Sequence, residues 1–136
     1  MTLVREAMVP DPPALDGSAS AQEAGELLSR DEVRAVFVSD EGRLIGVVTR
    51  KTLVREIVAL GCDPRATQLA GIAEVAYLPI DASTDLTEAF HLLEEHDLER
   101  VPVTEDGRLV GVLSRSVLQR RLAEDAPPPD EGQQHV

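Results

Sequence analysis

The hydrophobic and polar positions of this chain follow one pattern that occurs twice, 65 residues apart. In each copy an extended, proline-bearing lead-in (residues 9–15 and 76–80) precedes apolar residues at helical spacing. A short apolar strand, a polar turn and a second strand rich in β-branched residues follow, within 35–49 and 101–114. A second amphipathic helical segment closes each copy. The pattern therefore predicts a β-α-β-β-α unit that is used twice.

The two copies align without a gap. Residues 41–57 and 106–122 are identical at eight of 17 positions, and most of the others are exchanges such as Glu for Asp, Ile for Val or Thr for Ser. The same offset holds over 43 residues, from 15–57 to 80–122. Such extended self-similarity indicates duplication of one structural unit. We therefore predict an α+β fold of two units related by a pseudo-twofold axis, each a small sheet packed on two helices.

Polar residues mark where the helices are expected to begin. Ser20 with Glu23 predicts a capping box, and Asp85 with Glu88 repeats it with Asp as the cap. Gly61 is expected to end the second helix of the first copy. The apolar helix faces are expected to be formed by Ala24, Leu27, Leu28, Leu53, Ile57 and Leu60 in the first copy, and by Ala89, Leu92, Leu93, Leu118 and Leu122 in the second.

These elements divide the chain into four parts. Residues 1–60 form the first unit, 61–72 a linker, and 73–123 the second unit. Residues 124–136 are rich in Pro, Asp, Glu and Gln, a composition that predicts a disordered acidic tail.

Composition and charge disfavour nucleic acid as a partner. The chain of 136 residues carries a formal net charge of −12, which repels a polyanion. It has no Trp, one Tyr and two Phe, so the aromatic platforms on which single-stranded nucleic acids stack are missing. Arg50–Lys51 and Arg120–Arg121 are the longest basic runs, and we interpret them as solvated helix faces.

The sequence also disfavours export, membrane insertion, metal binding and catalysis. Cys62 is the only cysteine, as expected in a reducing compartment, and neither a signal peptide nor an 18-residue apolar run is present. We therefore expect a cytoplasmic location. His91 and His96 are five residues apart, the wrong spacing for shared metal ligation on a helix. No catalytic arrangement of nucleophile and base is apparent, so we expect a protein that is not an enzyme and requires no cofactor.

Two equivalent motifs resemble a known family. Gly46-Val47-Val48-Thr49 and Gly111-Val112-Leu113-Ser114 each end a predicted strand and precede a helix, and Arg100 stands before the strand Val-Pro-Val of the second copy. Residues 3–123 resemble a tandem pair of CBS domains, also called a Bateman module. The resemblance implies two units packed back to back, with two clefts that bind AMP, ADP, ATP or S-adenosylmethionine as a regulatory ligand. It also implies a homodimer that signals through its dimer interface or through a separate enzyme or transporter partner.

The family's ligand motif is Gly-apolar-apolar-Thr/Ser-x-x-Asp, whose carboxylate binds the ribose diol. Here Thr52 and Val117 replace that Asp, so we expect weak ligand binding. The resemblance implies the ligand contacts Thr49 with Thr52 in one cleft, Ser114 with Arg100 in the other, and Arg50 and Arg115 near bound anions. Two interpretations of these residues remain open. Thr49 and Ser114 serve the ligand or only cap helices, and the arginines bind an anion or only solvate helix ends. The alternative function is accordingly a structural interaction or dimerisation module that has lost ligand binding.

Overall fold

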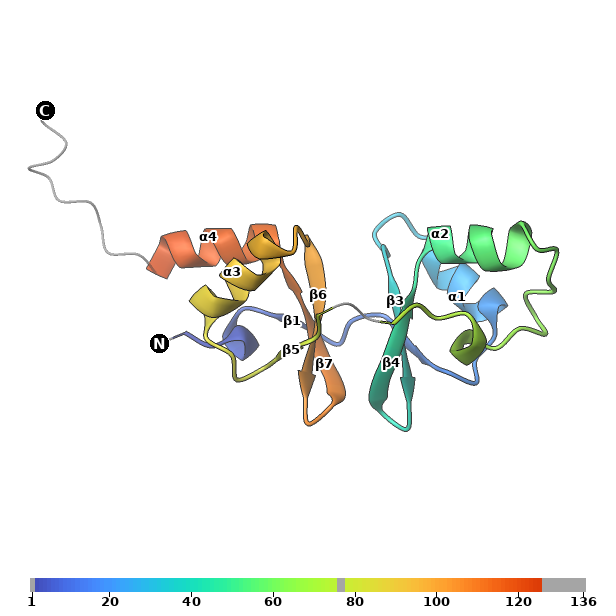
Figure 1. Ribbon diagram of the computed structural model, residues 1–136, viewed down its shortest axis with the longest axis horizontal. Helices are drawn as coiled ribbons and strands as arrows, with labels where there is room; N and C mark the ends of the chain where they lie inside the picture. The colour runs from blue at the N-terminus through green and yellow to red at the C-terminus, as the bar shows by residue number, and fades with distance from the viewer. Residues whose placement is uncertain (1, 76–77, 126–136) are drawn as a thin grey trace, which may run out of the picture.

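The computed structural model describes residues 2–75 and 78–125. Two halves lie side by side, with hairpin strands at the centre and helices on the outside (Figure 1). The strands form one sheet of order β2-β3-β4-β7-β6-β5, and β1 also pairs with β7. Their bounds are β1 (Val9–Pro10), β2 (Ala14–Asp16), β3 (Val36–Asp40), β4 (Arg43–Val48), β5 (Ile80–Asp81), β6 (Arg100–Glu105) and β7 (Arg108–Ser114).

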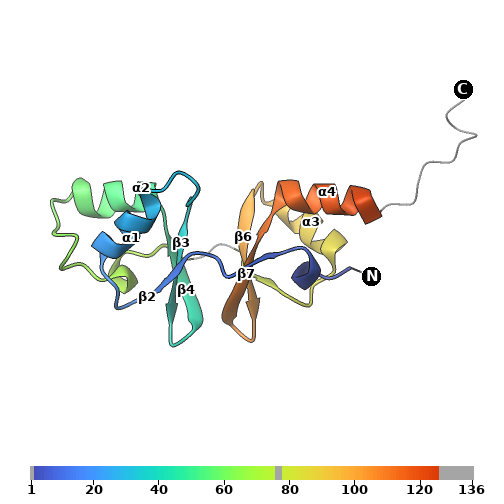
Figure 2. The same cartoon turned by 180° about the vertical axis from the view of Figure 1, so that it is seen from behind.

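The helices pack on the outer sides of the two hairpins. Helices α1 and α2 belong to the first half and α3 and α4 to the second (Figure 2). A π-helical turn, η2, continues α2, and short 3₁₀ turns, η1 and η3, lie in the segments that lead into the units. Their bounds are η1 (Val4–Glu6), α1 (Ala21–Leu28), α2 (Arg50–Leu53), η2 (Val54–Val58), η3 (Leu69–Gly71), α3 (Leu86–Glu95) and α4 (Arg115–Asp125).

The strand registers of the two halves repeat at the sequence offset. Val38 pairs with Gly46 in the first hairpin, and Val103 pairs with Gly111 in the second. Both hairpins carry an irregularity immediately after this pair, and a short parallel strand flanks each of them. This correspondence confirms the predicted α+β fold of two β-α-β-β-α units.

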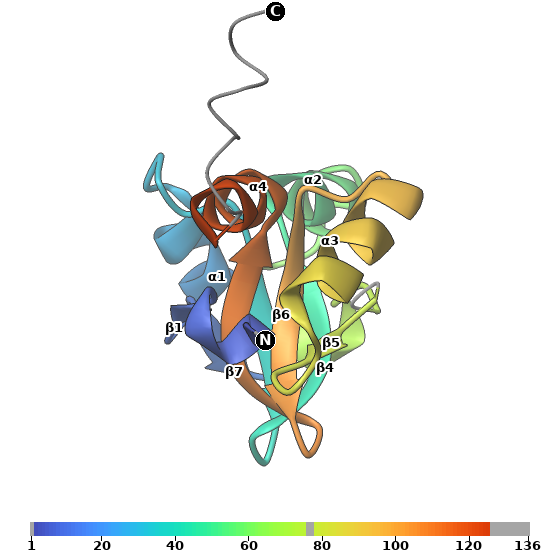
Figure 3. The same cartoon turned by 90° about the vertical axis from the view of Figure 1, so that its left-hand side faces the viewer.

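Equivalent residues meet where the two hairpins join. Arg43 of β4 pairs with Arg108 of β7, its counterpart at the offset. The Arg43 guanidinium donates to the carbonyl of Asp106 at 3.2 Å, and the Arg108 guanidinium donates to the carbonyl of Glu41 at 3.2 Å. This reciprocal exchange is what a pseudo-twofold axis between the hairpins requires. Figure 3 shows both hairpin turns at one end of the molecule and α2 and α4 at the other.

Each unit also repeats a carboxylate turn before its first helix. Asp16 accepts hydrogen bonds from the backbone N–H and the hydroxyl of Ser18, at 3.0 and 2.6 Å. Asp81 accepts the same pair from Ser83, at 2.9 and 2.6 Å. In both turns the serine hydrogen bonds hold the pKa of the carboxyl below its ordinary value.

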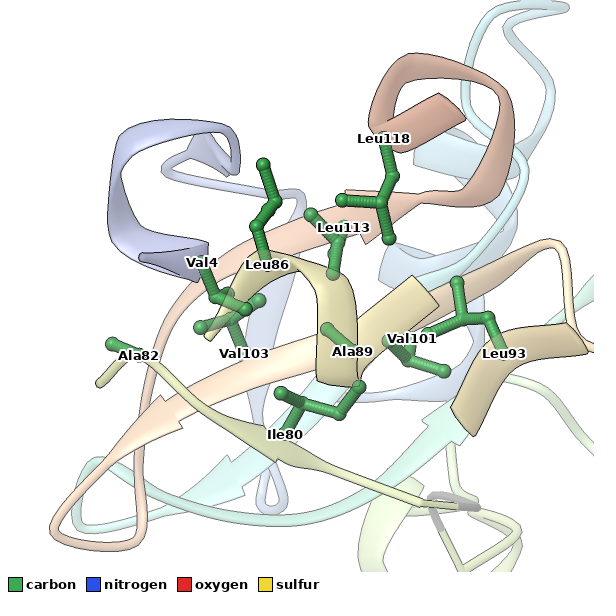
Figure 4. Packing of buried hydrophobic residues seen from close by; sticks show 10 residues of the cluster. All are labelled: Val4, Ile80, Ala82, Leu86, Ala89, Leu93, Val101, Val103, Leu113 and Leu118. Atoms are coloured by element: carbon green, nitrogen blue, oxygen red, sulfur yellow. The ribbon is translucent and has the colours of Figure 1, made fainter. Parts of the chain in front are cut away.

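The segments that precede the two lead-ins, around Val4 and around Leu69 to Glu74, cross between the halves. Val4 near the N-terminus is fully buried in the core of the second half, beside Leu86 and Leu113 (Figure 4). Conversely, Leu69, which follows the first half, is fully buried in the core of that half. Beyond Leu69, the backbone of Glu74 pairs with that of Val47 of β4 through two hydrogen bonds of 2.8 and 2.9 Å. Packing thus ties the first residues of the chain to the second unit. The sequence boundaries 1–60, 61–72 and 73–123 stay a prediction, and the predicted tail lies outside the described residues from residue 126 on.

One of the two predicted capping boxes forms. The Ser20 hydroxyl accepts from the backbone N–H of Glu23 at 3.2 Å, and the Glu23 carboxylate accepts from the backbone N–H of Ser20 at 2.8 Å. The prediction for Asp85 was wrong, because its side chain makes no capping hydrogen bond. The crossing N-terminal segment does reach this helix end, since the carbonyl of Thr2 accepts from the N–H of Leu86, the first residue of α3, at 2.9 Å.

The second helix of the first half ends differently from the prediction. Leu53 and Ile57 pack on the core, but Leu60 is 67% exposed. The N–H of Ala59 donates to the carbonyl of Val54 at 2.8 Å, which is π-helical spacing. The wider turn rotates later residues off the apolar face, so the assignment of Leu60 to that face was wrong. Gly61 follows with φ +68°, as expected for a helix stop.

Candidate functional site

A cavity of about 340 Å³ lies between the halves, where β1 runs along β7. It forms at the sheet end opposite the hairpin turns, because β3 and β6 begin there while β4 and β7 end there. Most of its wall is apolar, and five charged or hydroxyl-bearing side chains interrupt it. The lining residues are Val9, Pro12, Pro13, Glu32, Val33, Arg34, Ala35, Phe37, Arg100, Val112, Ser114, Ser116 and Val117.

An open groove of about 470 Å³ adjoins this cavity. Arg34 and Arg100 line both hollows, so these side chains stand where the two meet. Thr49 contributes a hydroxyl, and the remaining lining of the groove is charged. The groove is lined by Arg34, Thr49, Arg50, Lys51, Glu99 and Arg100.

The groove concentrates positive charge that has no carboxylate partner. Arg34, Lys51 and Arg100 are exposed, and within residues 2–75 and 78–125 their side chains make no hydrogen bond or ion pair. Arg50 donates only to the backbone carbonyl of Arg30, at 2.8 Å. Glu99, the one acidic lining residue among those described, faces the Arg115 guanidinium at 3.7 Å. A chain of net charge −12 therefore presents a local cationic surface, which attracts anions.

Thr49 and Thr52 cap the helix that follows β4. Their hydroxyls lie 3.2 Å apart, and each accepts from the other residue's backbone N–H, at 3.0 Å to Thr52 and 3.4 Å to Thr49. Thr49 lines the groove, but Thr52 is fully buried. Thr49 therefore caps α2 and also lines the groove, whereas the ligand contact expected of Thr52 lacks an exposed hydroxyl.

Ser114 and Arg100, which the resemblance assigned to one cleft, both line the cavity. The Ser114 hydroxyl also accepts from the N–H of Val117 at 3.3 Å and lies 2.9 Å from the hydroxyl of Ser116, so it caps α4. Arg115 lines neither hollow, because its guanidinium faces Asp97 at 3.5 Å and Glu99 at 3.7 Å. Arg50 shares the groove with Arg100, which the sequence had placed with Ser114 alone.

Comparison with known proteins identifies this architecture. The family model described as CBS domain matches residues 4–59 and 72–124. The chain belongs to the CBS-domain family. The two matches confirm the tandem CBS pair expected from the repeated motifs.

Several relatives resemble this CBS pair along most of its length. Hypoxic response protein 1 of Mycobacterium tuberculosis is 28% identical over 127 residues, covering 93% of this chain and 89% of the relative. A crystal structure of Hypoxic Response Protein I with two coordinated zinc ions has a TM-score of 0.76 at 25% identity and covers 89% of this chain and 99% of that one. The crystal structure of CBSX2 in complex with AMP has a TM-score of 0.73 at 28% identity and covers 92% and 98%.

The zinc ions of that neighbour have no evident counterpart in the described part of this CBS pair. Within residues 2–75 and 78–125, no group of three or more His, Cys, Asp and Glu side chains is placed to hold a metal ion. The same residues include no helix with the length and apolar character that a bilayer span requires.

Sequence reasoning missed part of the cavity and groove of the CBS pair. Lys51 was interpreted as a solvated helix residue, although it lines the groove beside Arg100, and Phe37 was assigned no role at all. The repeat carried a usable signal, because Ala35 and Arg100 are equivalent positions and both line the cavity. Residues at the start of the equivalent strands β3 and β6 therefore meet across the pseudo-twofold axis.

Proposed function

We propose that this CBS pair is a regulatory module that binds an adenosine nucleotide between its halves. The observation that carries the proposal is the pair of arginines, Arg34 and Arg100, which have no partner among the described residues and flank an apolar cavity. An apolar pocket with a few charged groups suits a ligand with a planar base and a phosphate. The similarity to CBSX2, which was solved with AMP, supports the same ligand class. Ligand binding then alters a dimer or partner interface, with a separate enzyme or transporter as the partner.

The proposed binding is weak. The family has a ribose-binding Asp at two positions that are Thr52 and Val117 in this chain. The Thr52 hydroxyl is buried and accepts a hydrogen bond from the backbone N–H of Thr49, and Val117 is apolar. Each missing charge-assisted hydrogen bond costs about 1.5–3 kcal/mol, or roughly one to two factors of ten in affinity. The ligand contacts retained in the proposal are Arg100, Ser114, Thr49 and Arg50, because these residues line the cavity or the groove.

Titration calorimetry with AMP, ADP, ATP and S-adenosylmethionine tests this function. We expect heat with at least one phosphate-bearing ligand, and Arg100→Ala should lower its affinity about tenfold or more. Arg65→Ala is the matched control, since it removes the same charge from a residue that lines neither hollow. Equal affinities for the two variants would contradict the proposed role of Arg100. Absence of heat with every ligand would remove the sensing function.

A second function is supported by a different observation. Val54 and Val58 of η2 are 58% and 71% exposed, and Leu60 just beyond it is 67% exposed. Exposed apolar groups gathered on one helix end favour association. A structural module that dimerises through this surface and binds no ligand would explain both replaced carboxylates. In either function we propose a homodimer in the cytoplasm, without catalytic activity and without nucleic acid or membrane as a partner.

A further inference from the structure

The helices on the outer side of the first half border a second groove, of about 380 Å³, which we call the outer groove. It shares no lining residue with the hollows between the halves. α1 contributes Gly25 to it, and α2 with η2 contributes Leu53, Ile57 and Val58. A β-carbon at position 25 would meet only Leu53, at 3.7 Å, whereas the equivalent residue of the second copy is Phe90, half-buried against its core. The first half is therefore open where the second half carries an aromatic side chain.

Exposed apolar side chains stand beside the outer groove. More than half of each of Val54, Val58 and Leu60 is exposed, and we call these three residues the apolar patch. Val58 also lines the outer groove, so the patch and the groove belong to one surface. The second copy has less apolar residues at the three equivalent positions, which are Gln119, Ala123 and Asp125. A surface with both a hollow and projecting apolar groups can pack against a second copy of itself about a twofold axis.

Two charges of opposite sign accompany this surface. Glu26 lines the outer groove, and Arg30 follows four residues later. Both residues are exposed, and within residues 2–75 and 78–125 neither side chain makes a hydrogen bond or an ion pair. A twofold axis reverses the order of the two charges in the second copy. Glu26 of each copy can then face Arg30 of the other, which makes the surface complementary to itself in charge as well as in shape.

The outer surface of the second half is unsuited to the same contact. Its helix α3 exposes Glu88, Glu94 and Glu95, and the last two stand where the first copy has Ser29 and Arg30. Two such surfaces repel each other, in chains that each carry a net charge of −12. Packing the same carboxylates against the apolar patch would remove them from water without a partner.

We infer that two copies of this chain associate through the outer surfaces of their first halves alone. The apolar patch of each copy packs into the outer groove of the other, and Glu26 pairs reciprocally with Arg30. This inference rests on the proposed homodimer and specifies its interface. It leaves the outer surface of the second half, formed by α3 and α4, uncovered in the dimer.

Equivalent substitutions in the two copies test which half forms the interface. Val58→Glu should weaken the dimer about tenfold or more, because the twofold axis places two carboxylates in an apolar contact. Ala123→Glu is the matched control, since position 123 is the exposed counterpart of position 58 and should leave the dimer affinity unchanged. Sedimentation equilibrium gives the dissociation constants, and circular dichroism checks that both variants fold.

A charge exchange tests the reciprocal ion pairs. Glu26→Arg and Arg30→Glu should each weaken the dimer about tenfold, because each change turns two attractive contacts into repulsive ones. The double variant Glu26→Arg/Arg30→Glu restores the opposite charges and should recover most of the affinity. Both side chains are exposed and have no partner among the described residues, so none of these changes should disturb folding.

Gly25→Phe tests the outer groove. The variant should fold, because the second copy accommodates Phe90 at the equivalent position and position 25 has space for a side chain. The aromatic ring should fill the groove and weaken the dimer about tenfold or more. A folded Gly25→Phe variant with wild-type dimer affinity would show that the partner copy does not enter the groove, and the inference would be overturned.

The outcomes separate this inference from the proposed homodimer. A wild type that is monomeric at micromolar concentration removes the homodimer and this inference with it. If the wild type dimerises but Val58→Glu and Ala123→Glu weaken it equally, both halves form the interface, and only this inference fails. A double charge variant that is no stronger than the single variants would contradict the pairing of Glu26 with Arg30.

Discussion

Gly46→Ala should destabilise the fold, because the segment that links the halves passes directly over this residue. A β-carbon at position 46 would lie 2.5 Å from the carbonyl oxygen of Glu74 and 3.0 Å from the β-carbon of Ala73. The Glu74 backbone pairs with Val47 through two hydrogen bonds, so it cannot withdraw without losing them. Overpacking of this kind costs about 1–3 kcal/mol. The Arg55–Glu74 ion pair holds the same segment on the first half and adds resistance to its movement.

Two further glycines calibrate this measurement. Gly111→Ala would meet the Met8 sulfur at 2.6 Å and the Val9 carbonyl oxygen at 2.9 Å. The Met8 side chain is flexible, and the backbone contact with Val9 is longer than the 2.5 Å contact with Glu74, so this cost should be smaller than at Gly46. Gly71→Ala is the control, because a β-carbon there meets nothing within 4 Å, and loss of a glycine from the unfolded chain should leave stability equal or raise it by about 0.4–1 kcal/mol.

Urea unfolding of the wild type and the three alanine variants measures these differences. The expected order of stability is Gly71→Ala, then Gly111→Ala, then Gly46→Ala. A Gly46→Ala variant that matches the Gly71→Ala variant would show that the segment around Glu74 does not pass as close to β4 as the structure places it. The reasoning about the crossed segments would then be refuted.

Two other measurements probe the acid response and the assembly. Asp16 and Asp81 have depressed pKa values in the folded state, so they add stability above the ordinary carboxyl pKa of 3.8, and this stability is lost as pH falls through the folded values. Ser18→Ala should therefore lower the urea midpoint at pH 7 and have little effect near pH 2; an equal loss at both pH values would contradict this linkage. For assembly, light scattering should give a dimer mass for the wild type, and Val58→Glu should shift it toward the monomer, whereas a wild-type monomer at micromolar concentration would remove the proposed dimer.

The sequence predicted the fold because duplication leaves a signal that does not depend on the details of either copy. The offset that aligns residues 41–57 with 106–122 also relates the hairpin registers and the carboxylate turns. It could not predict which half each lead-in joins, since sequence order alone places Val4 with the first unit. It could likewise not predict that the carbonyl of Thr2 accepts from the N–H of Leu86 at the start of α3.

The sequence predicted some residues of the candidate site and missed others, depending on whether a residue lies near a motif. Arg100 and Ser114 were found because each lies in or beside a motif, and both line the cavity. Lys51 was not recognised, because its significance depends on the distant residues Arg34 and Arg100 that line the groove with it. Spacing along the chain does not reveal a cluster that is assembled from three separate segments.

Duplication gives the two units the same backbone fold. The proposed function depends on the positions at which their side chains differ. The pseudo-twofold axis brings the equivalent positions 35 and 100 into one cavity, where the first copy has Ala and the second has Arg. Ala35 leaves space in the cavity, and Arg100 supplies positive charge there. Outside the cavity, Val58 of the first copy corresponds to Ala123 of the second, so the first copy presents the larger apolar side chain. Because the two copies have diverged, the second copy places the positive charge of Arg100 in the cavity between the halves. The first copy exposes the apolar Val58 at the outer end of its helices, where we propose association.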